Sequence, residues 1–145
     1  MSNETSNSGK GTLFEDEAEK ALLDAYGYRF NREVGIGIGE PPKRHRFDLV
    51  DPTTNTVVEC KAFTWTVSGN MPSAKITTAR EALFYLQWLP DDWTKVLAMA
   101  RSLRTGHGES LAEYFVRLNS HLLGDVAVVE VDSGIARVLF GQLAE

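Results

Sequence analysis

Two short stretches decide the fold: Phe47–Val50, with the sequence FDLV, and Thr56–Ala62, with the sequence TVVECKA. The residues between them, Asp51–Asn55, read DPTTN, and proline and asparagine among small polar residues are typical of a turn. Valine-rich segments on both sides of such a turn favour extended strands. We therefore expect two strands joined as a hairpin.

Charged side chains gather on one face of this predicted hairpin. Strand alternation places Glu59 and Lys61 on one face, whereas Val58 and Cys60 point to the other face and enter the core. If the strands pair, Asp48 lies near Glu59, and two carboxylates and an ammonium meet at the edge of an apolar sheet. Neighbouring buried carboxylates raise each other's pKa, and a divalent cation such as Mg²⁺ removes that conflict. Lys61 could then hold a water molecule or offset charge on a phosphate.

A simpler interpretation of the same residues stays open. Asp48 would begin the turn, and Glu59 and Lys61 would form an ordinary ion pair on a solvated strand face. The choice between the two interpretations depends on the rest of the chain.

Length and composition favour one domain. The chain has 145 residues, enough for a sizeable core, and we expect residues 12–145 to form it. Residues 1–11 are polar and are predicted to be a flexible tail. The only cysteine, Cys60, excludes an internal disulfide and a cysteine-based zinc site, and we expect a buried thiol.

Charge and hydropathy limit the partners. The net charge of −5 means that any binding of nucleic acid must use local basic patches. The sequence has no apolar run of membrane-spanning length and no signal-peptide pattern at its N-terminus, so we expect a cytoplasmic protein without a membrane partner.

Hydrophobic periodicity predicts the remaining elements. The expected order is helix, three strands, helix, strand, helix and two strands. Gly27 should end the first helix, and Thr12 with Glu15 should cap its start. Glu15 either serves only this cap or looks back toward the sheet. Beyond the hairpin, we expect helices over 12–26, 73–89 and 109–123, and strands over 28–34, 95–100, 125–131 and 135–140.

Basic and polar residues near the hairpin are candidates for phosphate contacts. Lys43, Arg44 and Arg46 form the densest positive charge, although basic residues at strand starts are often merely solvated. Arg80 and Gln87 share one arc of the second helix and either flank the site or border the core. The glycine-rich stretch 35–39 is predicted to be a flexible hairpin connection, because prolines and not a helix follow it.

This order of elements, together with particular residues, resembles the PD-(D/E)xK phosphodiesterase superfamily. Asp48 matches the family's metal-binding aspartate, and Glu59-Cys60-Lys61 matches the E-x-K half of the signature. Phe14-Glu15 and Gly27-Tyr28 look like the "FE…GY" opening of its methylation-dependent restriction branch. Phe47 replaces the proline of "PD", at a position that varies in the superfamily. The resemblance ends near residue 100, and the last helix and hairpin would be an addition.

The resemblance implies a fold, an activity and a site. The fold would be α/β and restriction-endonuclease-like, with an αβββαβ core and a mixed central sheet flanked by helices. The activity would be that of a Mg²⁺-dependent deoxyribonuclease, an endonuclease for which Mn²⁺ could replace Mg²⁺ and RNA could replace DNA. Asp48, Glu59 and the main-chain carbonyl of Cys60 would bind the metal, Lys61 would position or activate the water, and Glu15 would hold a second metal or a metal-bound water.

Two other classes remain open at this point. One is a catalytically inactive nucleic-acid-binding module on the same fold, and the other is a protein-interaction module that uses the terminal hairpin. A domain of this size does not easily enclose a duplex alone, so we expect the nuclease to act as a homodimer.

Overall fold

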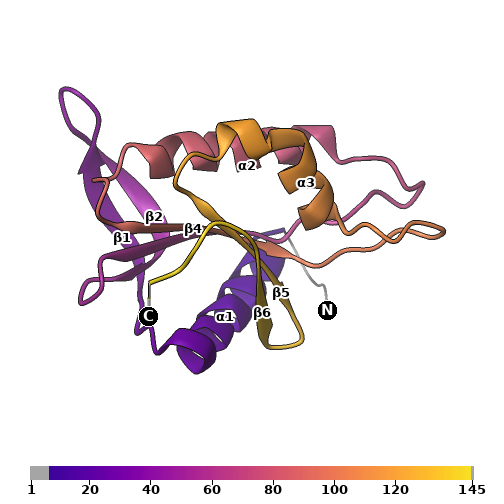
Figure 1. Ribbon diagram of the computed structural model, residues 1–145, viewed down its shortest axis with the longest axis horizontal. Coiled ribbons are helices and arrows are strands. Elements are labelled where there is room, and N and C mark those ends of the chain that lie inside the picture. Colours follow the sequence, from indigo (N-terminus) through magenta and orange to yellow (C-terminus); the bar gives the residue numbers. More distant parts are fainter. Residues whose placement is uncertain (1–6, 145) are drawn as a thin grey trace.

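Helices cover both faces of a six-stranded mixed sheet in the computed structural model, which describes residues 7–144 (Figure 1). The predicted α/β class and the predicted order of elements are both confirmed. The elements are α1 (Asn7–Tyr26), β1 (Asn31–Ile38), β2 (Lys43–Asp51), β3 (Thr56–Lys61), α2 (Ser73–Gln87), β4 (Thr94–Ala100), α3 (Leu111–Asn119), the short 3₁₀ turn η1 (Ser120–Leu122), β5 (Ala127–Asp132) and β6 (Ile135–Phe140).

The strands lie in the sheet in the order of the chain, β1 to β6. β1, β2 and β3 are antiparallel neighbours, β3, β4 and β5 run parallel, and β6 returns antiparallel to β5. Parallel neighbours need crossover connections, which α2 and α3 supply on one face, while α1 covers the other face (Figure 1). The terminal hairpin, β5 and β6, therefore extends the central sheet, and α3 packs on one of its faces.

Each face of the sheet has its own hydrophobic core. Val57 and Leu97 belong to the core under α2 and α3, whereas their chain neighbours Val58 and Val96 belong to the core under α1. All four side chains are fully buried. Strands covered on both faces read as nearly continuous apolar runs, which explains the sequences of β3, β4 and β5.

The first helix is longer than predicted. It begins at Asn7, so residues 7–11 form helical turns in place of a flexible tail, and Thr12 lies inside the helix instead of capping it. Residues 1–6 of the predicted tail lie outside the described residues. Once the buried face around Phe14 and Leu22 fixes a helix, each further residue adds a hydrogen bond at little cost. Gly27 ends the helix as predicted, with φ of 78° and its N–H bonded to the Leu23 carbonyl.

The glycine-rich stretch is strand and not a flexible connection. Gly35, Ile36, Gly37 and Ile38 pair with β2, and the turn falls at residues 39–42. The isoleucines pack against the core under α2, and this contact stabilises the extended conformation of the stretch. A Cβ at Gly35 would lie 2.6 Å from Nη2 of Arg44, so a side chain there would displace the arginine.

Among the described residues, no helix has both the length and the apolar character needed to cross a membrane.

The packing of β4 yields a stability prediction. Leu97 is fully buried at the centre of the sheet, so Leu97→Ala should leave a cavity and lower the free energy of unfolding by roughly 2–5 kcal/mol. Urea unfolding followed by circular dichroism measures the change. The control is Ile135→Ala, at a side chain that is 69% exposed, for which we expect roughly 0.5 kcal/mol or less. Equal effects of the two substitutions would contradict the placement of β4.

Candidate functional site

Two reciprocal hydrogen bonds join β2 to β3 at the predicted catalytic residues. The Asp48 N–H donates to Oε1 of Glu59 over 2.9 Å, and the Cys60 N–H donates to Oδ2 of Asp48 over 2.8 Å. The main-chain pairing of the two strands ends at Leu49 and Val58, which are the chain neighbours of Asp48 and Glu59. Carboxylates therefore replace the backbone ladder at this point, and the predicted proximity of Asp48 and Glu59 is confirmed.

The regular alternation of β2 breaks at Asp48. Phe47 packs into the core under α2, whereas Leu49, two residues on, packs into the core under α1. On the neighbouring strand, Glu33 adopts a φ of 54°, in the left-handed region that a glutamate seldom occupies. Glu33 lies opposite Asp48, between the pairs Arg32–Leu49 and Val34–Phe47. Local irregularities of this kind re-aim side chains and are common beside active sites.

The irregularity brings three carboxylates together. Glu15 from α1, Glu33 from β1 and Asp48 from β2 each offer an oxygen, and these oxygens all lie within 4.8 Å of one another. They line a pocket of about 510 Å³ together with Gly11, Thr12 and Arg32. Of the two alternatives that the sequence left open for Glu15, the structure has the one in which it looks back toward the sheet. Glu33 was not predicted, because neither the pairing register of β1 nor its left-handed residue is visible in the sequence.

Burial and mutual repulsion shift the titration of this cluster. Burial, followed by the charges of Asp48 and Glu33, raises the pKa of Glu15 to about 7. Burial and the charge of Asp48 raise the pKa of Glu59 to about 8. Burial also raises the pKa of Asp48, although the Cys60 N–H and Lys61 act in the opposite direction. Shifts of this kind, in a pocket, are typical of functional carboxylates.

Protein cations compensate only part of this negative charge. Arg32 approaches Glu15 at 3.4 Å but lies closer to Glu19, at 2.8 Å. Arg46 approaches Glu33 at 3.8 Å, with both side chains largely exposed, so the interaction is screened by water. Among the described residues, none lies within ion-pair distance of Asp48 or Glu59.

Lys61 is a further cation close to the carboxylates in the chain. It ends β3, two residues from Glu59, and is partly buried. Its charge lowers the pKa values of both Asp48 and Glu59, which places it in their electrostatic surroundings. Within the described part of the chain it forms no salt bridge, so its ammonium can meet a water molecule or an anion.

The donor set suits a hard divalent cation. Three clustered carboxylate oxygens, with a further carboxylate at Glu59, match the oxygen ligands and negative charge that Mg²⁺ prefers. Oδ2 of Asp48 accepts from Cys60, whereas Oδ1 accepts no hydrogen bond from the described residues. Metal binding by Glu59 and by the Cys60 carbonyl stays a prediction. The Cys60 thiol is not a donor candidate, because burial raises its pKa well above the ordinary value and holds it protonated.

The predicted nucleic-acid contacts fall into two groups. Lys43, Arg44 and Arg46 are exposed on β2 and lead directly to Asp48. Arg80 and Gln87 instead connect α2 to the segment that follows β4, through hydrogen bonds to Oδ1 of Asn119 and to the Leu122 carbonyl. The structure thus gives these two side chains interhelical partners, and their contact with nucleic acid stays a prediction.

A scan against protein-family models finds no matching family, and searches of curated proteins and of solved structures find no match to the chain.

The raised pKa of Glu59 predicts how stability depends on pH. Between the ordinary pKa of 4.5 and the folded value of about 8, the folded protein keeps a proton that the unfolded chain has released. Stability therefore falls as the pH rises through this interval. Glu59→Gln keeps an acceptor for the Asp48 N–H and removes the titration. In EDTA it should gain roughly 2–5 kcal/mol over the wild type between about pH 5 and about pH 8.

Urea unfolding at both pH values measures this difference. The control is Glu109→Gln, at a partly exposed carboxylate whose pKa is lowered by its hydrogen bonds to Arg117, so this variant should show no such gain. A Glu59→Gln variant whose stability follows the wild type at both pH values would contradict the burial of a titrating Glu59.

Proposed function

We propose that the protein is a Mg²⁺-dependent nuclease that hydrolyses phosphodiester bonds in DNA, on a restriction-endonuclease-like fold. One observation carries the proposal: reciprocal backbone-to-carboxylate hydrogen bonds hold Asp48 beside Glu59, the carboxylate cluster holds it beside Glu15, and Lys61, which forms no salt bridge with any described residue, ends the strand that carries Glu59. These are the residues on which the sequence resembles the PD-(D/E)xK superfamily. The αβββαβ order and the parallel pairing of β3 with β4 further support the proposal.

Each residue has a role that follows from its position. Asp48, Glu15 and Glu33 would hold Mg²⁺, with Glu59 completing the set from β3. A bound Mg²⁺ supplies Lewis-acid stabilisation of charge on the phosphate and a lowered pKa for coordinated water. Lys61 would orient the attacking water and offset negative charge on the phosphate oxygens. The fixed positions of the carboxylates mean that little reorganisation is needed when the substrate binds.

The basic end of β2 would guide the substrate. Lys43, Arg44 and Arg46 lie exposed on the strand that carries Asp48, so phosphates bound there would be led toward the cluster. The overall negative charge would repel nucleic acid from other surfaces. As a homodimer the protein would present two such centres, and the edge strand β6 offers backbone groups for pairing.

Cleavage assays on purified variants test the proposal. Lys61→Ala and Asp48→Asn should each reduce Mg²⁺-dependent cleavage of single-stranded and duplex DNA by roughly 100-fold or more. Lys61→Ala removes the cation beside the scissile phosphate. Asp48→Asn removes the ligand charge but can still accept from the Cys60 N–H, so the fold should persist.

The controls for this assay are Lys75→Ala and Asp91→Asn, which change exposed side chains of the same types. Both should cleave like the wild type. Full activity in purified Lys61→Ala or Asp48→Asn, with melting curves unchanged, would overturn the assignment.

Glu33 provides an independent prediction, because the family signature does not include it. If Glu33 contributes a ligand, Glu33→Gln should raise the Mg²⁺ concentration needed for half-maximal cleavage by roughly tenfold, with a smaller effect on the rate at saturating metal. A Mg²⁺ titration of the cleavage rate separates these effects. A Glu33→Gln variant with the wild-type Mg²⁺ dependence would remove Glu33 from the site.

A further inference from the structure

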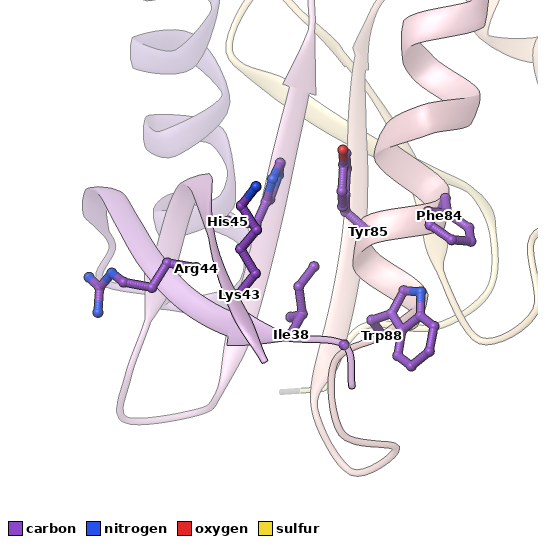
Figure 2. A pocket seen from close by; sticks show the side chains of 8 residues that line it. Ile38, Lys43, Arg44, His45, Phe84, Tyr85 and Trp88 are labelled. Atoms are coloured by element: carbon purple, nitrogen blue, oxygen red, sulfur yellow. The ribbon is translucent and has the colours of Figure 1, made fainter. Parts of the chain in front are cut away.

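A second hollow lies between the β1–β2 hairpin and the last turns of α2. It has a volume of about 450 Å³, and its lining includes residues of both elements. Figure 2 shows Ile38, Lys43 and His45 on the hairpin facing Tyr85 and Trp88 on and just after the helix, while Arg44 points away. We call this hollow the aromatic groove.

Two aromatic side chains on the helix side of the aromatic groove are largely exposed to solvent. The side chains of Phe84 and Trp88 are 59% and 51% exposed, and their rings meet edge to face at 6.3 Å. Tyr85 lies between them in sequence and is only partly buried. Flat, accessible rings of this kind can stack on nucleobases of any sequence.

The hairpin side carries a buried polar atom that no described residue satisfies. The His45 ring stacks on Tyr85, with centroids 3.9 Å apart and planes 16° apart. Its Nε2 is buried and has no hydrogen-bond partner among the described residues. Leaving a buried polar atom unsatisfied costs free energy, so a small rotation of the ring that brings Nε2 to a ligand's hydrogen-bonding group would be favourable.

A cation faces the aromatic groove. Lys43 faces the aromatic groove, and Arg44 and Arg46 lie on the same strand, in a chain whose net charge is −5. Arg44 points away from the aromatic groove, Arg46 approaches Glu33, and Glu40 and Glu81 add negative charge at this end, so Lys43 is the cation that a ligand in the groove would meet. Aromatic rings beside cations are the combination found in sites for single-stranded nucleic acid.

The aromatic groove also leads to the proposed catalytic centre. His45 and Asp48 lie on one strand, about 10 Å apart at the usual rise per residue. That length corresponds to about three stacked nucleotides. Burial lowers the pKa of His45, while the charge of Asp48 acts to raise it and the charge of Lys61 acts to lower it.

We propose that the aromatic groove binds an unpaired base of a nucleic-acid strand a few nucleotides from the phosphate that the carboxylate centre attacks. The base stacks on the exposed rings of Phe84 and Trp88, a small rotation of the His45 ring lets Nε2 meet the polar edge of the base, and Lys43 meets the adjoining phosphate. The inference rests on the proposed nuclease function and specifies its substrate as single-stranded, or duplex with an unpaired segment.

The test measures binding without cleavage. A labelled single-stranded oligonucleotide, a blunt duplex of the same length and an abasic strand with the same phosphates are titrated with the full chain in EDTA. We expect the single strand to bind roughly tenfold more tightly than the abasic strand and more tightly than the duplex. Equal affinity for the single and abasic strands would overturn the inference, because the bases would then contribute nothing.

Two variants assign the effect to the aromatic groove. Trp88→Ala and Phe84→Ala, both at half-exposed side chains, should each remove most of the preference for the base-bearing strand, and Trp88→Phe should restore part of it. Ile135→Ala, an exposed apolar residue on β6, is the matched control and should bind like the wild type. If the groove instead holds a protein partner, wild type and Trp88→Ala will agree in every oligonucleotide titration, which would overturn the inference.

The failure of this inference can be told apart from the failure of the proposed function. Both proposals are supported if Trp88→Ala no longer binds the single strand more tightly than the abasic strand and if cleavage in Mg²⁺ depends on Asp48. If Trp88→Ala still binds the single strand more tightly than the abasic strand, and cleavage depends on Asp48, only the inference about the aromatic groove is overturned. If tighter binding of the single strand than of the abasic strand depends on Trp88, but the protein does not cleave, the proposed nuclease function is overturned. The aromatic groove then remains a binding site for single strands.

Discussion

The exchange of hydrogen bonds between Asp48 and the strand β3 is the constraint on which the rest of the site depends. Each carboxylate accepts from the backbone of the other strand, the Asp48 N–H bonding Glu59 and the Cys60 N–H bonding Asp48. Backbone pairing between β2 and β3 ends at Leu49 and Val58, so the first half of β2 pairs only with β1. These hydrogen bonds therefore hold both carboxylates in place. Beyond them the first half of β2 is not paired with β3, and with β1 it forms the hairpin that lines the aromatic groove.

The fold supports this arrangement at a cost in stability. Burial and repulsion raise the pKa values of Glu15 to about 7 and of Glu59 to about 8, so the centre is destabilised near neutral pH when no cation is bound. Apolar cores on both faces of β3 and β4 hold the strands that carry it. A bound cation would relieve the repulsion between the carboxylates, and this relief would contribute to the free energy of metal binding.

The sequence predicted the parts of the site that depend on periodicity. Alternation along β3 placed Glu59 and Cys60 on opposite faces, and the helical spacing of Phe14 and Leu22 left Glu15 at the border of the buried stripe. It could not predict Glu33, because that residue joins the cluster only through the register of β1 and a left-handed φ of 54°. The aromatic groove was missed because Phe84 and Trp88 lie far from β2 in the chain. The start of α1 was misplaced because the packing of its buried face extended the helix beyond the expected cap.

The central claim is that the carboxylate cluster is a metal site, and Mg²⁺ binding measured by calorimetry at about pH 8 tests it most directly. The titration is made with the wild type and Asp48→Asn, alone and with a short non-cleavable single strand present. Our account predicts that the wild type binds Mg²⁺, that the strand strengthens the binding, and that Asp48→Asn abolishes it. Binding of equal strength by Asp48→Asn, or no binding by the wild type even with the strand present, would contradict the account.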